Sequence, residues 1–204
     1  MALPEIVLAS TSGYRRELLS RLQIPFSQTA PCFEESQQPG ESPERMALRL
    51  AEGKARSVEA IMAVDKPEGQ TVIIGSDQVA HRGAAILSKP GNHTNAATQL
   101  TASSGQWVHF CTALFLLHSD KQTASAVETY SVKFRRLSEN QISRYLSQEQ
   151  PYDCAGSLKA ESLGITLLED ARGRDITTLY GLPLMLLREL FLSIDVDITS
   201  EAED

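Results

Sequence analysis

In the stretch "EIVLASTSGYRRELL", residues 5–19, an apolar strand passes directly into a leucine-rich helix. Residues 5–10 read as a buried strand, and residues 17–22 as the helix that follows it. Small polar residues fill the junction. The first turn of a helix leaves backbone N–H groups without partners, so such a junction suits an anion. Arg15 and Arg16 add positive charge, and the junction therefore indicates a phosphate site.

The composition describes an acidic globular chain. It has 204 residues, of which 42% are apolar, and a net charge of −7. We expect a single domain over residues 1–195 and an acidic, disordered tail over 196–204. The charge argues against a general binder of nucleic acid or of anionic membranes. The start of the chain lacks a signal-peptide pattern, and no apolar run is long enough to span a bilayer. The three cysteines are odd in number and widely spaced, which fits a reducing compartment. We therefore expect a cytoplasmic protein.

The order of the expected elements favours an α/β fold. Ser42 and Pro43 mark the start of a helix over residues 44–64, as N-cap and first-turn residue. The other expected elements are a loop over 25–40, a central strand over 71–77, a hairpin over 80–90 that pivots at Gly83, a helix over 92–103, two long antiparallel strands over 107–119 and 123–137, a helix over 138–148, short strands over 164–170 and 174–180, and a helix over 182–192. Because βα units are mixed with hairpins, we predict a single mixed sheet, parallel and antiparallel, flanked by helices.

A few charged residues could carry chemistry. Asp77 ends an apolar strand, where a carboxylate is placed for a metal ion or for proton transfer, although an ordinary loop cap explains it equally well. Lys54 and Lys89, taken singly, are better explained as surface lysines, and Glu34 and Glu35 as a solvated acidic loop. Together they supply what triphosphate hydrolysis requires: carboxylates for a divalent ion, cations for phosphate oxygens and a base that orients water.

The common nucleotide-binding and hydrolase signatures are absent from the sequence. It contains neither the G-x-x-x-x-G-K-[ST] loop nor a G-x-G-x-x-G after the first strand, and no G-x-S-x-G elbow. The four histidines show no metal-ligand spacing, and we interpret them as strand or surface residues; they are His81, His93, His109 and His118.

Seven ordered segments nevertheless resemble one family. They are "LASTSGYRRELL", "RLAEGKA", "IIGSDQV", "LSKP", "ASSG", "CAGSLKAESLGITL" and "GLPLMLL", and they span nearly the whole chain. In order and spacing they resemble the Maf-like nucleotide pyrophosphatases, which implies a Maf/inosine-triphosphatase-like fold. The "SDQ" and "CAGS-x-K-x-E" versions resemble the branch that hydrolyses 7-methyl-GTP rather than the branch that acts on dTTP and UTP.

The resemblance implies a role for each matching residue. Asp77 would be the catalytic proton acceptor and, with Glu35, would hold a divalent metal ion, Mg²⁺ or Mn²⁺. The residues implied to bind the triphosphate are Ser10, Arg15, Lys54 and Lys89, and the specificity positions fall on Tyr14, Gln78 and Glu161. The family usually has proline where this chain has Gly13, so the first loop should be less rigid here.

The implied substrate agrees with physical chemistry. Methylation at N7 gives guanine a positive charge, which favours stacking on the aromatic face of Tyr14 by about 0.5–2 kcal/mol. The carboxylate of Glu161 can accept both the N1–H and the amino group of guanine. Without the resemblance, Tyr14 would be a packing aromatic and Glu161 a surface carboxylate.

The resemblance thus predicts hydrolysis of 7-methyl-GTP to 7-methyl-GMP and pyrophosphate, which removes a modified nucleotide before it enters nucleic acid. The predicted partner is a small nucleotide, with neither nucleic acid nor membrane, and a homodimer is an expectation from the family only. Two alternatives stay open: the same reaction on dTTP or UTP, and a nucleotide-binding regulator of cell division.

Overall fold

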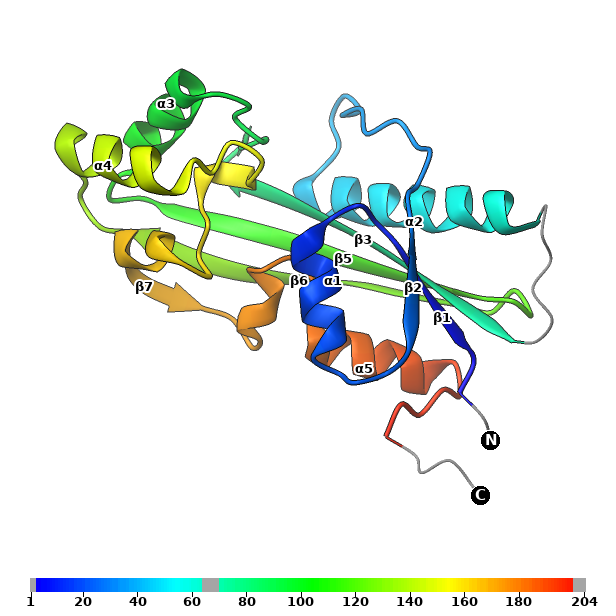
Figure 1. The fold of residues 1–204 in the computed structure, drawn as a ribbon. Coiled ribbons are helices and arrows are strands. Elements are labelled where there is room, and N and C mark those ends of the chain that lie inside the picture. The colour runs from blue at the N-terminus through cyan, green and yellow to red at the C-terminus, as the bar shows by residue number, and fades with distance from the viewer. Residues whose placement is uncertain (1–2, 64–69, 200–204) are drawn as a thin grey trace.

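A mixed sheet runs the length of the molecule in the computed structural model, which describes residues 3–63 and 70–199 (Figure 1). Within these residues seven strands pair in the order β2-β1-β3-β5-β6-β7, with β4 on the edge of β3. The strands are β1 (Glu5–Ala9), β2 (Phe26–Thr29), β3 (Thr71–Arg82), β4 (Ala85–Ile86), β5 (Trp107–His118), β6 (Thr123–Phe134) and β7 (Leu168–Arg172). The helices are α1 (Gly13–Ser20), α2 (Pro43–Met62), α3 (His93–Ser103), α4 (Glu139–Glu149) and α5 (Leu184–Ser193), with short 3₁₀ turns η2 (Ala155–Ser157), η3 (Leu163–Leu167) and η4 (Ile176–Thr178). The predicted single mixed sheet flanked by helices is confirmed.

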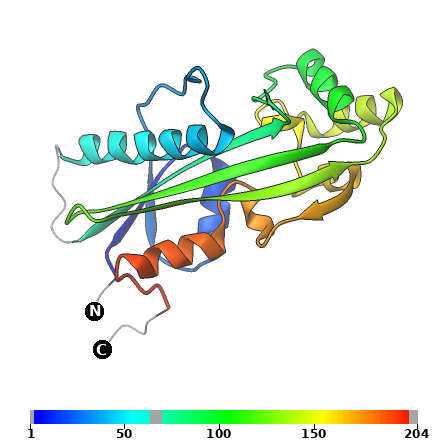
Figure 2. The same cartoon turned by 180° about the vertical axis from the view of Figure 1, so that it is seen from behind.

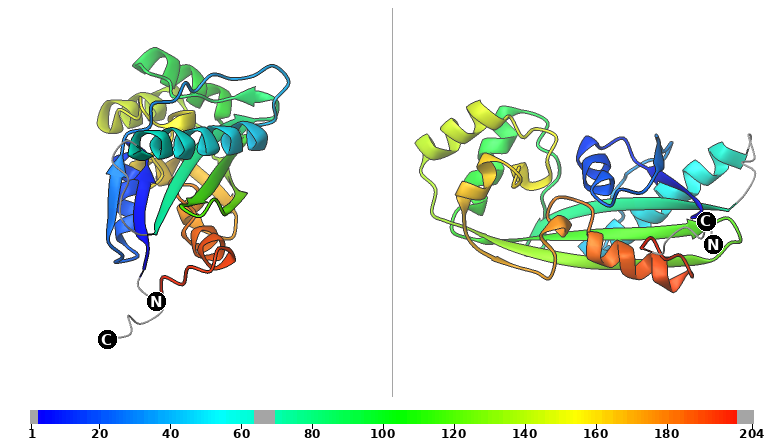
Figure 3. Two further views of the ribbon diagram at one scale, coloured as in Figure 1. Left: turned by 90° about the vertical axis from the view of Figure 1, so that its right-hand side faces the viewer. Right: turned by 60° about the horizontal axis from the view of Figure 1, so that its bottom comes forward.

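Three long strands, β3, β5 and β6, join the two ends of the molecule. β1 pairs in parallel with β2 and β3, whereas β3, β5, β6 and β7 are antiparallel neighbours. Helices α2 and α5 cover opposite faces of the sheet at one end (Figures 2 and 3). At the other end α3 and α4 pack over the same long strands, and β7 extends the sheet beside β6 (Figure 1).

Helix α2 lies close against β3 because both contribute small residues to the contact. Ser42 caps the helix by accepting a hydrogen bond from the Arg45 N–H, and Pro43 occupies its first turn, as predicted. A Cβ at Gly75 would lie 2.1 Å from the carbonyl oxygen of Ala51, so only glycine permits this approach. The close contact sets Lys54 of α2 over the strand.

The edge of β3 is left open between two of its partners. β1 pairs with it only as far as Gly75, and β4 begins to pair at His81. In the strand pairings of the described residues, the segment between them has β5 on one side only. An open edge at the carboxyl end of a parallel strand is a place where ligands bind in α/β sheets.

The structure corrects several expected boundaries. Helix α1 begins at Gly13 and not at residue 17, because Ser12 caps it. The expected loop over 25–40 contains β2, a short strand that pairs with β1. The expected strand over 174–180 is instead the turn η4, and the strand expected over 164–170 starts only at Leu168.

Two predicted segments end outside the described residues: residue 64 of the helix expected over 44–64, and residues 200–204 of the expected tail. The first part of the expected tail is packed: Val196 is 7% exposed, and Ile198 lies against the same apolar cluster as α5. Among the described residues, no helix is long and apolar enough to cross a membrane.

Candidate active site

A cavity of about 570 Å³ opens at the free edge of β3. Its walls come from the β1–α1 junction, the loop before α2, the middle of α2 and the segments around residues 87–89, 153–161 and 179–181. All nine site residues predicted from the sequence line it: Ser10, Tyr14, Arg15, Glu35, Lys54, Asp77, Gln78, Lys89 and Glu161. The fold therefore gathers residues that are up to 151 positions apart in the chain (161 − 10).

The junction between β1 and α1 is a tight turn that two serine hydroxyls stabilise. Ser10 is 3% exposed, and its hydroxyl accepts a hydrogen bond from the Ser12 N–H at 3.1 Å. Ser12 in turn caps α1, its hydroxyl accepting from the Arg15 N–H at 3.3 Å. The chain is thereby folded into a tight turn whose helix start faces the cavity, which suits an anionic group.

Arg15 is held by a segment distant in sequence. Its Nε donates to the carbonyl oxygen of Gly181 at 2.9 Å, and the hydroxyl of Ser76 donates to the same oxygen at 3.1 Å. One carbonyl thus fixes the guanidinium beside β3, with Arg15 still lining the cavity. Partial burial lowers the pKa of Arg15, whereas the charges of Asp77 and Glu35 raise it.

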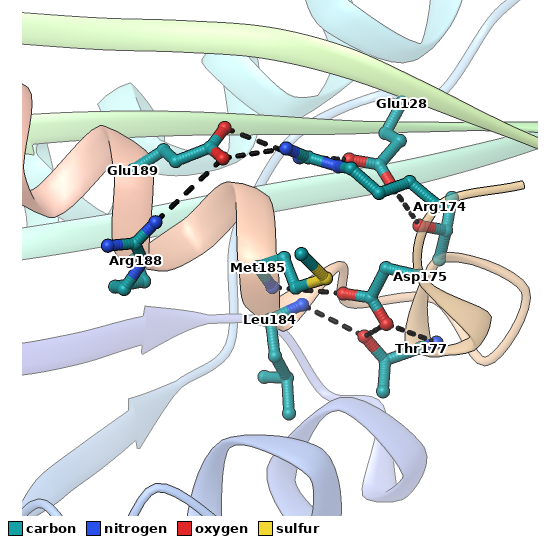
Figure 4. A network of polar contacts seen from close by, with 9 residues as sticks. Glu128, Arg174, Asp175, Thr177, Leu184, Met185, Arg188 and Glu189 are labelled. Atoms are coloured by element: carbon teal, nitrogen blue, oxygen red, sulfur yellow. Dashed lines mark hydrogen bonds and ion pairs between the residues drawn. The ribbon is translucent and has the colours of Figure 1, made fainter.

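The segment that carries Gly181 is itself anchored by polar contacts (Figure 4). Asp175 accepts hydrogen bonds from the Thr177 N–H at 2.8 Å and from the Met185 N–H at 2.9 Å, so it caps both η4 and the start of α5. Arg174 bridges Glu128 of β6 and Glu189 of α5 at 2.7 and 2.6 Å. These contacts explain why residues 174–180 form a turn rather than the expected strand.

Lys54 joins the two predicted metal-binding carboxylates. Its Nζ lies 2.6 Å from Asp77 Oδ1 and 3.0 Å from Glu35 Oε1. Lys54 and Asp77 are 5% and 6% exposed, whereas half of the Glu35 side chain is in solvent. Burial raises the pKa of Asp77, and the charges of Lys54 and Arg15 partly oppose this.

Contacts with α2 place the loop that carries Glu35. The ring of Phe33 lies directly over Gly53, where a Cβ would be only 2.2 Å from it. Arg49 binds Glu41 through two hydrogen bonds of 2.7 Å and donates to the Ser36 carbonyl at 2.9 Å. Glu35 is therefore brought to Lys54 by neighbours on both sides.

Glu35 and Asp77 fit a divalent metal ion by their chemistry. Both already share one cation, the Lys54 ammonium. Mg²⁺ and Mn²⁺ prefer oxygen donors, and Mg²⁺ is usually bound by one or two carboxylates together with substrate phosphates. Lys89 is exposed at the rim of the same cavity, where it can meet a phosphate group.

Tyr14, Cys154 and Glu161 also line this cavity and lie near one another. The pKa of Tyr14 is raised by burial and then by the neighbouring Cys154, Asp153 and Glu161. Glu161 is exposed, and partial burial of its carboxyl group raises its pKa. An aromatic ring beside a carboxylate can receive a cationic base that offers hydrogen-bond donors.

Hydrogen bonds hold the amide nitrogen of Gln78 in place. Its Nε2 donates to Thr112 Oγ1 at 2.9 Å and to the Thr178 carbonyl at 2.8 Å. Among the hydrogen bonds of the described residues, its Oε1 has no partner, so this oxygen is the atom that Gln78 offers to a ligand. Thr112 and the 178–181 segment, which position Gln78 and Arg15, were missed in the sequence, because they act through backbone carbonyls and one buried hydroxyl.

The chain is similar to known proteins along most of its length. Residues 5–194 match the sequence profile of the Maf-like protein family. A 7-methyl-GTP pyrophosphatase of Methylobacillus flagellatus is 47% identical over 96% of this chain and 100% of its own length. One of Nitrosococcus oceani is 48% identical over 92% of both.

A more distant likeness is to the crystal structure of a nucleoside-triphosphatase / dITP/XTP pyrophosphatase from Mycobacterium abscessus. It covers 65% of this chain and 75% of that one, with a TM-score of 0.42 and 20% identity, and contributes nothing to the assignment of the site. Because the family profile matches residues 5–194 and the two relatives are 47% and 48% identical over almost all of it, this chain belongs to the Maf-like protein family.

Proposed function

We propose that this protein is a nucleotide pyrophosphatase that hydrolyses 7-methyl-GTP to 7-methyl-GMP and pyrophosphate. The observation that carries the proposal is that one cavity is lined both by a buried Lys54–Asp77 pair with Arg15 and Glu35 and by Tyr14 with Glu161. The names of the relatives, 44–48% identical, support the same substrate.

Asp77 is the proton acceptor in this reaction. A water oxygen forms a bond to the α-phosphorus, its proton passes to the Asp77 carboxylate, and the bond from the α-phosphorus to the bridging oxygen breaks. Pyrophosphate leaves with the electron pair of that bond. Arg15 and Lys54, which are held in place by hydrogen bonds, and the exposed Lys89 would stabilise its growing charge.

The reaction would use a divalent metal ion, Mg²⁺ or Mn²⁺, held by Glu35 and Asp77. When bound, the ion neutralises phosphate charge and favours ionised water. Lys54 keeps the two carboxylates together by bonding to both.

Base recognition falls to Tyr14, Glu161 and Gln78. The aromatic face of Tyr14 would stack on the cationic 7-methylguanine ring, and the Glu161 carboxylate would accept its N1–H and amino group. Gln78 offers its Oε1 from a side chain that Thr112 and Thr178 hold still. We place the activity in the cytoplasm, where it removes a modified nucleotide before incorporation; a homodimer stays a prediction.

The test is pyrophosphate release from the purified protein with Mg²⁺ or Mn²⁺, compared for 7-methyl-GTP, GTP, dTTP, UTP and CTP. A clear preference for 7-methyl-GTP supports the proposal. A preference for dTTP or UTP supports the pyrophosphatase reaction but contradicts the assignment of Tyr14 and Glu161 to recognition of 7-methylguanine. Binding of nucleotide without turnover of any of them supports a regulatory protein instead.

A further inference from the structure

A second group of potential metal ligands lies outside the residues assigned above. Ligand atoms of Glu44, His81 and Cys111 all lie within 4.8 Å of one another. Glu44 is exposed, His81 is half-buried and Cys111 is fully buried. None of the three lines the cavity at the edge of β3. In the sequence they are too far apart to form a recognisable motif.

The strand register explains why these residues meet. His81 of β3 pairs with His109 of β5, and Val79 with Cys111. Residues directly opposite in an antiparallel pair share a face, and so do residues two apart in a strand, which puts His81 and Cys111 diagonally on one face. Val79 packs against α2 on that face. Glu44, in the first turn of α2, brings a carboxylate oxygen within 4.8 Å of a ligand atom of each of these two residues.

The imidazole of His81 is already oriented for metal binding. Its Nδ1 lies 3.0 Å from the carbonyl oxygen of Gly83 in the β3–β4 turn. A carbonyl oxygen only accepts, so Nδ1 carries the proton and Nε2 of the neutral ring has its lone pair available. Metal-binding histidines are typically fixed in this way by a backbone carbonyl on the other nitrogen.

We propose that Glu44, His81 and Cys111 bind one Zn²⁺-class cation. A thiolate, an imidazole and a carboxylate are the three donor types that zinc takes, and three protein ligands leave a fourth position for water. The sulfur and nitrogen donors disfavour Mg²⁺, whose oxygen-donor site at Glu35 and Asp77 is separate. Binding replaces the S–H bond of Cys111 by a sulfur–metal bond, and the proton passes to solvent.

Such an ion would cross-link three elements: the first turn of α2, the end of β3 and the middle of β5. Met46, two residues after Glu44, and Val79, two before His81, both line the cavity. The site would therefore fix the wall of the cavity without touching the reacting groups. A titratable neighbour of the group is His109, whose ring centroid lies 5.1 Å from that of His81 and whose Nδ1 is 2.7 Å from the Ser131 hydroxyl.

The experiment is Zn²⁺ binding to the full-length, nucleotide-free protein in excess Mg²⁺, by competition with a chromogenic chelator. We expect one Zn²⁺ per chain and a rise in melting temperature on its addition. Co²⁺ in place of Zn²⁺ should give a thiolate-to-cobalt charge-transfer band. Cys111→Ser should abolish the band, and His81→Gln or Glu44→Gln should weaken Zn²⁺ binding by at least the roughly 10- to 100-fold that loss of an outer-shell partner costs.

Matched controls are Cys32→Ser and His93→Ala, which change an exposed cysteine and an exposed histidine outside the group and should leave binding unchanged. Asp77→Asn should also keep it, which separates this site from the proposed catalytic one. If Cys111→Ser does not fold, the proposal is tested by the loss of Zn²⁺ affinity in Glu44→Gln and His81→Gln. Absence of stoichiometric binding, or binding that these variants leave unaltered, overturns the proposal.

Discussion

Lys54 Nζ and Asp77 Oδ1 lie 2.6 Å apart, and the two side chains are only 7% and 8% exposed. The pair joins α2 to β3 at the wall of the cavity. Removal of one partner from a buried pair leaves an uncompensated charge, which is costly for folding. Substitutions that keep the size of the side chain avoid a cavity but still leave one charge without its partner, so the free energy of unfolding has to be measured beside turnover.

Replacement of Asp77 by asparagine should remove turnover and spare binding. The amide keeps the shape of the side chain but cannot accept the proton of the attacking water, so we expect kcat to fall by roughly 10²- to 10⁴-fold. Nucleotide affinity should change little, because Arg15, Lys54 and Lys89 remain. Steady-state kinetics and titration calorimetry measure the two effects. Asp170→Asn, on exposed β7, is the control; near-normal turnover by Asp77→Asn would refute the assigned base.

The pH profile of kcat/KM should report the environment of Asp77. The base acts when it is deprotonated, so activity falls as the pH drops through its pKa. Burial raises this pKa above its ordinary value of 3.8. The acidic limb of the profile, where kcat/KM falls at low pH, should therefore have its midpoint above pH 3.8. Lys54→Met removes a charge that lowers the pKa and should move the limb to still higher pH, whereas Lys54→Arg should leave it nearly in place. A limb that does not respond to Lys54→Met would show that another group titrates.

Glu161→Gln should reduce the preference for 7-methyl-GTP over UTP. The variant loses the negative charge that accepts two adjacent donors, a charge-assisted contact of about 1.5–3 kcal/mol, or roughly 10- to 150-fold in kcat/KM. The ratio of kcat/KM for the two nucleotides measures it. Glu169→Gln, on exposed β7, should leave this ratio unchanged. An unaltered ratio in Glu161→Gln would remove this residue from base recognition.

Gly13→Pro should stabilise the protein. Gly13 is the first residue of α1, where proline is favoured, and Ser12 before it has φ −69° and ψ 121°, which a following proline accepts. The free energy of unfolding in urea should rise by about 0.4–1 kcal/mol, because the unfolded chain loses freedom. Gly83→Pro is the contrasting variant: its φ of +56° is closed to proline, so stability should fall. A loss of stability in Gly13→Pro would mean that this junction is strained.

Local patterns predicted the elements whose signals lie in neighbouring residues. Ser42, Asn92 and Ser138 each cap the helix that they were expected to start, because a cap requires only a side chain and the next turn of backbone. The two long strands after residue 106 were predicted for the same reason. β2 was missed, because a short polar edge strand has no pattern of its own and exists through its pairing with β1.

The order of elements along the chain predicted the mixed sheet, and the seven motifs indicated the family and, through that resemblance, nine of the residues that line the cavity. Tertiary structure alone decided that Lys54 sits between Glu35 and Asp77, that the Gly181 carbonyl holds Arg15, and that Glu44, His81 and Cys111 converge. Those contacts depend on strand register and on the close approach of α2 over Gly75, which no local pattern encodes.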